Sequence, residues 1–304
     1  MTRGSIGGPG SFSGGGSFSG AWSPLTVPPL PAVLFSLPDG PFQHREVNDF
    51  AAPEPAGDRR CIWTGALDAH AGPGQKLLHF VVLDPDELVM RTALGLDTRL
   101  TPAGHEQCRQ LQRLTESLRP GLFITSPLTR TAETTLLSFG PQIQASGARI
   151  IALDDLRETV DYRCDARRAR AELAADFPAI DFSGCAERDS MWAKYEGRHD
   201  RESADAPALA ARARRALASL AARPEKELVI VTHKGFLWNT LSMGQPDGKF
   251  PEMPPVFDFG DDDVRRWMCS AFAECEVRSV LADFNPPPKR GAIGGKVMST
   301  RFGV

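Results

Sequence analysis

Two observations predict an α/β domain with a largely parallel sheet over residues 77–284. Short apolar runs alternate with helix-forming segments along this stretch, as in repeated strand–helix units. The chain has 304 residues, 41% of them hydrophobic and 24% charged, which suits a globular fold with a sizeable core. The formal net charge of -3 argues against general nucleic-acid binding. No apolar run approaches the ~20 residues that span a bilayer, so we expect no membrane partner.

Each element of this prediction has a local signal. Thr101 and Pro102 are a suitable N-cap and first residue for a helix that Pro120-Gly121 ends, and Ser126-Pro127 has the same pattern before a second helix. The sequence also predicts an Ala-rich helix and a helix directly after the fourth strand, at 204–222 and 235–242. Buried strands are predicted at 77–83, 122–126, 148–153 and 227–232. The alternating segment 275–283 is predicted to be a last, edge strand.

The ends of the chain are predicted to lie outside this domain. Residues 1–41 are rich in Gly, Ser and Pro, which predicts a disordered tail. Residues 42–76 read as an irregular N-terminal extension and 285–304 as a loose C-terminal tail. We expect the six cysteines to be free thiols of a cytoplasmic protein, because they form no disulfide or zinc spacing. The alternative is an organellar protein whose Ser-rich, acid-poor start is a transit peptide.

Polar side chains follow three of the predicted strands. Ser126 and Arg130 stand where a strand gives way to a helix, a place where free N–H groups and a guanidinium favour an anion. His233 follows the apolar strand ELVIVT, and ligands of open α/β sheets bind at the carboxyl ends of strands. An acidic run that includes Glu158 follows the third strand and could supply a general acid. Each residue also has a plain structural interpretation, as a cap, a core histidine or a solvated loop.

Together these segments resemble a known family. TRLTPAGHEQCRQL, SPLTRTAET, LRE and VTHKGF, in this order, are similar to motifs of the histidine phosphatase (phosphoglycerate-mutase-like) superfamily. The resemblance covers about residues 77–284. It implies a three-layer α/β/α sandwich with a phosphate pocket at the carboxyl edge of the sheet.

The resemblance also implies roles for residues. By motif, Arg130 and His233 would bind the phosphoryl oxygens with Ser126 and Thr232 close by, and Glu158 would protonate the leaving alcohol. Neither a metal nor an organic cofactor is implied. An insertion at about 161–203 would lie over the pocket. Its arginines could attract a polyanion or form a solvated helix face; they are Arg163, Arg167, Arg168 and Arg170.

The sequence departs from the family at the nucleophile. The family's first strand ends in Arg-His-Gly, and the His forms a phosphohistidine. This chain reads LLHFVVLDPDEL, which aligns Val82, Leu83 and Asp84 with those three positions. Valine and leucine can neither attack phosphorus nor hydrogen-bond a phosphate, and an aspartate there opposes an anion.

Three functions are compatible with this pattern. The first is a degenerate phosphatase, a pseudoenzyme that binds a phosphorylated small molecule or another phosphoester through Arg130, Glu158 and His233. The second is an active phosphomonoesterase whose nucleophile is supplied elsewhere or is lost from this gene model; a transcript encoding Arg-His near residue 82 would favour it. The third is a scaffold without catalysis. The sequence indicates neither which phosphoester is bound nor the oligomeric state.

Overall fold

The computed structural model describes residues 73–82, 96–198, 201–259, 262–273 and 275–284. It also describes the backbone of three short strands, β1 (Ala32–Phe35), β2 (Arg45–Glu46) and β3 (Cys61–Ile62). Leu83 and Asp84, aligned with the family's His-Gly, lie outside the described residues, as do the predicted C-terminal tail and most of the two predicted N-terminal segments.

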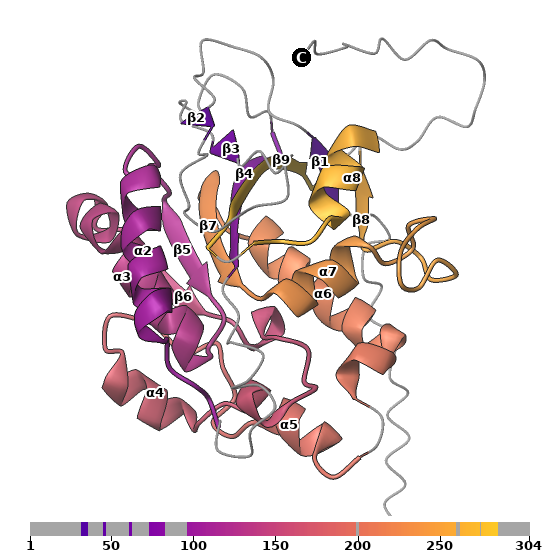
Figure 1. Cartoon of the computed structure of the whole chain (residues 1–304), viewed down its shortest axis with the longest axis horizontal. Coiled ribbons are helices and arrows are strands. Elements are labelled where there is room, and N and C mark those ends of the chain that lie inside the picture. Colours follow the sequence, from indigo (N-terminus) through magenta and orange to yellow (C-terminus); the bar gives the residue numbers. More distant parts are fainter. Residues whose placement is uncertain are drawn as a thin grey trace, which may run out of the picture.

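The core of the fold is a seven-stranded sheet in the order β6-β5-β7-β4-β9-β1-β8 (Figure 1). Its longer strands are apolar and buried as predicted. Neighbouring strands run parallel except at β9, which is antiparallel to both β4 and β1. The remaining strands are β4 (Gln75–Val82), β5 (Leu122–Thr125), β6 (Arg149–Ala152), β7 (Glu227–Thr232), β8 (Phe257–Phe259) and β9 (Val277–Asp283).

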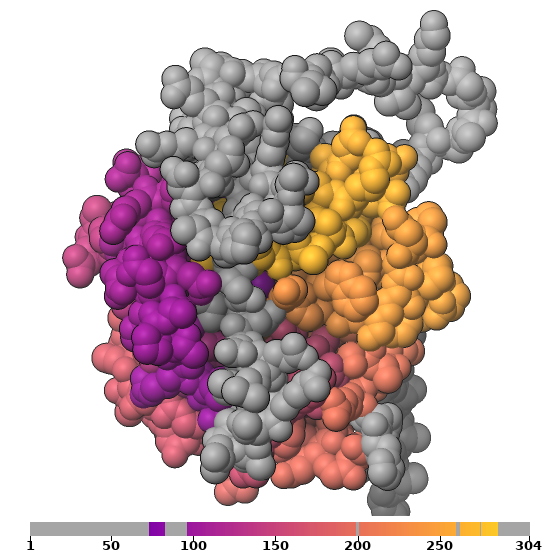
Figure 2. All heavy atoms as spheres, in the orientation of Figure 1, coloured from indigo at the N-terminus to yellow at the C-terminus, as the bar shows by residue number. Residues whose placement is uncertain are grey.

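Helices cover both faces of the sheet, so the predicted three-layer α/β/α architecture with a mostly parallel sheet is confirmed. One apolar cluster joins the sheet to α2 (Pro102–Leu114), α3 (Thr129–Ser146) and α4 (Arg170–Asp176). The other joins it to α6 (Ala206–Ala221), α7 (Lys234–Leu241) and α8 (Asp262–Cys269). Figure 2 shows α2, in purple, and α7 with α8, in orange to yellow, on opposite sides of the visible face.

Between β6 and α6 the chain forms short elements at one end of the molecule (Figure 1). They are α4, α5 (Ser190–Tyr195) and three 3-10 turns; the turns are η2 (Asp154–Leu156), η3 (Arg163–Asp165) and η4 (Glu202–Ala204). A parallel bridge between Ile151 and Asp181 ties this region to the edge of the sheet. The segment therefore stays close to the ends of β5, β6 and β7.

The prediction of β9 as an edge strand is wrong. β9 lies between β4 and β1, and Val277–Ala282 are all buried. Its alternating sequence suggested one solvated face, but its polar residues Arg278 and Ser279 are buried in hydrogen bonds. The true neighbour on its far side, β1, comes from the 1–41 segment that we expected to be disordered.

The two predicted helix starts have different outcomes. Thr101 caps α2 as expected, since its hydroxyl accepts the Gly104 N–H at 3.1 Å, and Pro102 is the first helical residue. The expected start at Ser126-Pro127 is wrong, because α3 begins at Thr129. The carboxylate of Asp97 accepts the Thr129 N–H at 2.8 Å, so a distant residue provides the cap.

Within the described part of the chain no helix is both long enough and apolar enough to cross a lipid bilayer. The five described cysteines are free thiols, as expected; they are Cys108, Cys164, Cys185, Cys269 and Cys275.

Candidate functional site

Ser126 and His233 meet at the carboxyl edge of the sheet. β5 and β7 are adjacent and parallel, so the residues that follow them emerge side by side. The Ser126 N–H donates to the Val231 carbonyl at 2.9 Å, which extends the pairing beyond β5. Ser126 Oγ lies 2.8 Å from His233 Nε2, and both residues are fully buried. Strand register therefore aligns a hydroxyl with an imidazole.

The environment of His233 keeps its imidazole neutral. Burial lowers its pKa well below 6.5, and the positive charges of Arg130, Arg157 and Arg212 lower it further. Near neutral pH the ring can therefore accept a proton or a hydrogen bond at one nitrogen and donate at the other.

Arg130 lies in the first turn of α3 and is also buried. Its guanidinium donates to the Cys164 carbonyl at 2.9 Å and to a carboxylate oxygen of Asp165 at 3.2 Å. Burial raises the pKa of Asp165 to about 6, although the charge of Arg130 opposes the shift. Asp165 thus stands where an anionic ligand of Arg130 would compete for the same guanidinium.

Glu158 is bound to the start of α7. Its carboxylate accepts the Phe236 N–H at 2.6 Å and the Gly235 N–H at 3.1 Å, and its own neighbour Thr159 donates at 2.8 Å. These hydrogen bonds attach the Glu158 side chain to the N-terminal end of α7. Glu158 therefore fixes the segment that carries His233, apart from any part in proton transfer.

Thr232, which the resemblance put close to the site, precedes His233 at the end of β7. Its hydroxyl donates to the Leu156 carbonyl at 2.8 Å. The group thus ties β7 to η2.

Two further buried arginines hold the region around the site. Arg157 pairs with both oxygens of Asp189, the nearer at 2.5 Å, and Arg212 pairs with both oxygens of Glu202 at 2.8 and 2.9 Å. Arg212 also donates to the Arg157 carbonyl at 2.7 Å. Removing one partner of such a buried pair lowers the free energy of unfolding by roughly 3–5 kcal/mol, because the other charge is left unpaired.

Three of the four inserted arginines that the sequence suggested are paired with carboxylates. Arg167 pairs with Asp154, Arg168 with Asp97 and Asp176, and Arg170 with Glu187, whereas Arg163 is exposed in η3 and takes part in none of these pairs. The four do not share one helix face, because only Arg170 lies in α4 and Arg167 is buried before that helix.

Val82, aligned with the family's first arginine, ends β4 and pairs in register with Thr232. Its side chain is fully buried in the apolar cluster below α6 and α7. The residue after it would follow the same strand end as His233, but Leu83 lies outside the described residues. Val82 itself, which is described, contributes no charge to the site.

Comparisons with known proteins identify the family of the chain. The profile of the histidine phosphatase superfamily (branch 1) matches residues 89–254. The chain belongs to this superfamily. The matched range begins after β4, so it does not include the segment where the superfamily's nucleophile motif would stand.

Relatives of this histidine phosphatase homologue are named as phosphoglycerate mutase-like proteins or phosphatases. Phosphoglycerate mutase-like protein 1 of Arabidopsis thaliana is 32% identical over 215 residues, 61% of this chain and 70% of that protein. A probable phosphatase of Schizosaccharomyces pombe is 29% identical over 165 residues, 54% of this chain and 74% of that protein. A mycobacterial glucosyl-3-phosphoglycerate phosphatase of known structure is 19% identical, covers 68% of this chain and 89% of its own, and has a TM-score of 0.37.

Sequence reasoning missed Asp165 and Asp97. Asp165 lies in the acidic stretch after β6, but nothing in its sequence context separates it from its neighbours. Asp97 stands 32 residues before the helix start that it caps. Both act across long loops, and only the tertiary structure shows their partners.

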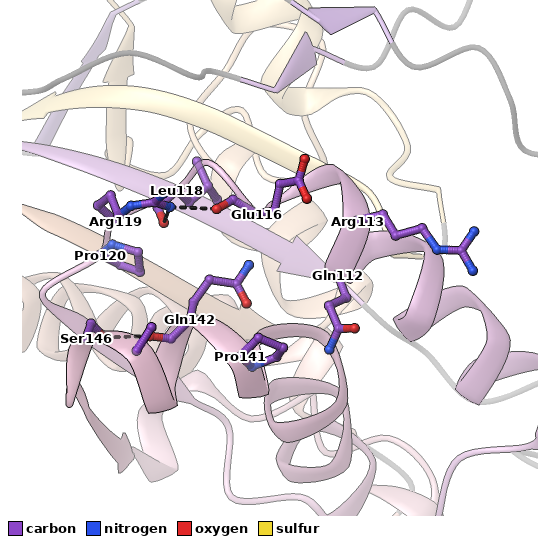
Figure 3. A pocket seen from close by; sticks show the side chains of 10 residues that line it. Gln112, Arg113, Glu116, Leu118, Arg119, Pro120, Pro141, Gln142 and Ser146 are labelled. Carbon is purple, nitrogen blue, oxygen red and sulfur yellow. Dashed lines mark hydrogen bonds between the residues drawn. The ribbon is translucent and has the colours of Figure 1, made fainter.

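A pocket of ≈ 460 Å³ lies elsewhere on this histidine phosphatase fold (Figure 3). It is formed by the C-terminal parts of α2 and α3 and the loop before β5, at the opposite edge of the sheet from Ser126. None of the candidate site residues lines it. Among the described residues no cluster of three His, Cys, Asp or Glu side chains is arranged to bind a metal ion.

Proposed function

We propose that this protein binds the phosphoryl group of a small phosphomonoester at the carboxyl edge of the sheet and lacks the phosphohistidine route of its superfamily. Arg130 and His233 are the phosphate ligands, with Ser126 beside them. The observation that carries the proposal is the buried contact of 2.8 Å between Ser126 and His233, with Arg130 in the first turn of the helix that follows Ser126. A hydroxyl, an imidazole and a guanidinium together provide the donors that phosphate oxygens accept.

The chemistry of the ligand follows from the superfamily and from the charges of the site. Relatives are named as phosphoglycerate mutase-like proteins and a probable phosphatase, which supports a phosphoester ligand. Arg130, Arg157 and Arg212 all act on His233 as positive charges, and a positive potential favours a dianion. Each arginine is partly neutralised by a carboxylate, so the expected affinity for phosphate alone is modest.

The phosphohistidine route requires a nucleophilic imidazole at the end of the first central strand. This chain has Val82 and Leu83 there, and neither side chain has a lone pair to attack phosphorus. With respect to that route the protein is a pseudoenzyme. Free thiols at the five described cysteines support a reducing compartment such as the cytoplasm.

In this proposal Glu158 has two functions. It holds the start of α7. By the family motif, it is also the carboxyl group that would protonate the leaving oxygen. The number of N–H groups that it accepts favours the first function in the resting protein.

The test is binding of inorganic phosphate by isothermal titration calorimetry. We expect saturable binding to the full chain and a loss of at least about tenfold in affinity for Arg130→Lys, because a lysine cannot present the planar fork of a guanidinium. Arg109→Ala is the matched control, since Arg109 is exposed on α2 and pairs with Glu106. Equal phosphate affinity in all three proteins, or no binding to the unaltered chain, would leave the scaffold function instead.

A further inference from the structure

The hydroxyl of Ser126 differs from the other hydroxyls around the site. Thr125, Thr131 and Thr232 each donate to a backbone carbonyl at 2.8–2.9 Å. Ser126 Oγ instead lies 2.8 Å from His233 Nε2. This is the distance at which a base removes a proton from a hydroxyl nucleophile.

The oxygen of Ser126 is also approached from its other side. The Leu128 N–H donates to Ser126 Oγ at 3.4 Å, at the N-terminal end of α3. A backbone N–H and the positive end of a helix dipole favour the oxygen when it gains negative charge. Ser126 Oγ thus has a base on one side and a stabilising donor on the other.

We infer that Ser126 is the nucleophile of this site and that His233 is its general base, in place of the histidine that the superfamily motif carries on the first central strand. The inference rests on the proposed binding of a phosphomonoester at the same edge. It assigns a catalytic function to Ser126, which the family motif implies only as a phosphate ligand.

The reaction has two balanced steps. In the first, Ser126 Oγ forms a bond to phosphorus while the bond from phosphorus to the leaving oxygen breaks, and the hydroxyl proton moves to His233 Nε2. That proton then passes to the leaving alkoxide, so an alcohol and a phosphoserine result. In the second step His233 Nε2 takes a proton from water, whose oxygen attacks phosphorus, and returns it to Ser126 Oγ as inorganic phosphate leaves.

His233 can take part in both transfers, but its state favours the second. Its lowered pKa keeps the ring neutral near neutral pH, so that it can accept the serine proton, and also makes it a weak base, which slows that step. The imidazolium that forms is a strong acid for the same reason, so it gives the proton up readily to the leaving oxygen. Arg130, in the first turn of α3, is the group that would neutralise the phosphoryl oxygens once it exchanges Asp165 for the substrate.

The burial of Ser126, Arg130 and His233 determines the turnover rate that we expect. All three have at most 1% of their surface exposed, so a substrate reaches them only after a local rearrangement, in which Arg130 exchanges Asp165 for the substrate. We therefore expect slow turnover of a generic substrate.

The experiment is turnover of ³²P-labelled para-nitrophenyl phosphate by the full chain, with an acid quench and mapping of the labelled peptide. We expect an acid-stable, alkali-labile phosphoserine on the peptide that contains Ser126. Ser126→Ala and His233→Asn should each lower kcat/KM by at least about a hundredfold. Thr135→Val is the matched control, because it removes a buried hydroxyl of α3 that donates only to a helix carbonyl.

Phosphate binding is measured on the same proteins so that the two proposals are judged separately. Phosphate binding without any turnover by the unaltered chain would overturn the nucleophile and leave the binding function intact. An acid-labile label, or full activity of Ser126→Ala, would also overturn it. Absence of phosphate binding by the unaltered chain would overturn both proposals. Peptide mapping on the unaltered chain decides the matter even if a variant does not fold.

Discussion

The pair of Arg130 and Asp165 makes anion binding depend on pH. Asp165 has a pKa of about 6 and contacts Arg130 at 3.2 Å. Above pH 6 its carboxylate neutralises the guanidinium, and below pH 6 protonation removes that charge. We expect sulfate, which stays a dianion throughout, to bind roughly tenfold more tightly at pH 5 than at pH 8, the size of about one pKa unit. Isothermal titration calorimetry across this range measures the change.

Asp165→Asn is the control for this pH dependence. The amide cannot ionise, so sulfate should bind tightly at both pH values and the dependence should become flat. Burial and three nearby arginines lower the pKa of His233, which moves its titration away from the upper part of this pH range. A slope that persists in Asp165→Asn would show that another group competes for Arg130.

The missing nucleophile motif gives a second prediction for single residues. The double change Val82→Arg and Leu83→His, with Asp84→Gly if the charge interferes, should create phosphatase activity whose covalent label is acid-labile. That label should persist when Ser126→Ala is added, because the restored histidine does not need the serine. A folded triple variant that stays free of the acid-labile label would mean that our alignment of this strand is wrong.

At this scale the sequence identified the three side chains that converge, but not their partners. The ends of β5 and β7 predicted Ser126 and His233 at one edge, and the parallel register brings them into contact. The attachment of Arg130 to Asp165 depends on how a long insertion folds back, which no local pattern records.

The start of α7 depends on Gly235. A Cβ atom at this position would lie 2.7 Å from Oε1 of Glu158, closer than unbonded atoms approach. We expect Gly235→Ala to displace Glu158 and to lower the free energy of unfolding by about 1–3 kcal/mol. Urea denaturation followed by circular dichroism measures the loss.

The matched control is Gly140→Ala within α3. Beyond the neighbouring residues and backbone of its own helix, no atom lies within 4 Å of a Cβ built there, and the residue is in the helix interior. Alanine should therefore stabilise the protein by up to about 1 kcal/mol. Equal effects of the two substitutions would show that the carboxylate of Glu158 does not restrict Gly235.

Elements with strong local signals were predictable, and elements defined by their neighbours were not. The apolar runs of β4, β5, β6 and β7 and the cap of α2 were found from sequence. The central place of β9 was missed because its buried Arg278 looks solvated in sequence, whereas Glu276 and several carbonyls satisfy its guanidinium. The three residues of β8 are too few to give a pattern, and the four residues of β1 stand in a Pro-rich segment that predicts disorder.

The whole molecule depends on β1 to complete its sheet. β1 pairs with β9 on one side and with β8 on the other, although it comes from the N-terminal Gly/Ser/Pro-rich part of the chain. We expect deletion of residues 1–30 to leave the thermal unfolding midpoint unchanged. Deletion of residues 1–36 should lower the midpoint and promote aggregation, because the side of β9 that pairs with β1 is left as an open sheet edge. Scanning calorimetry and light scattering compare the three proteins.

The position of β1 has a consequence for the order of events at the ribosome. Ala32–Phe35 is made early, yet its partners start at Phe257 and Val277. At roughly 5–20 residues per second, this segment waits on the order of ten to fifty seconds before either partner is translated. During that interval the nascent chain carries an apolar segment without its strand partners. Chaperones that bind such segments should therefore raise the yield of folded protein. They should have a smaller effect on a variant in which this strand is moved to the C-terminus.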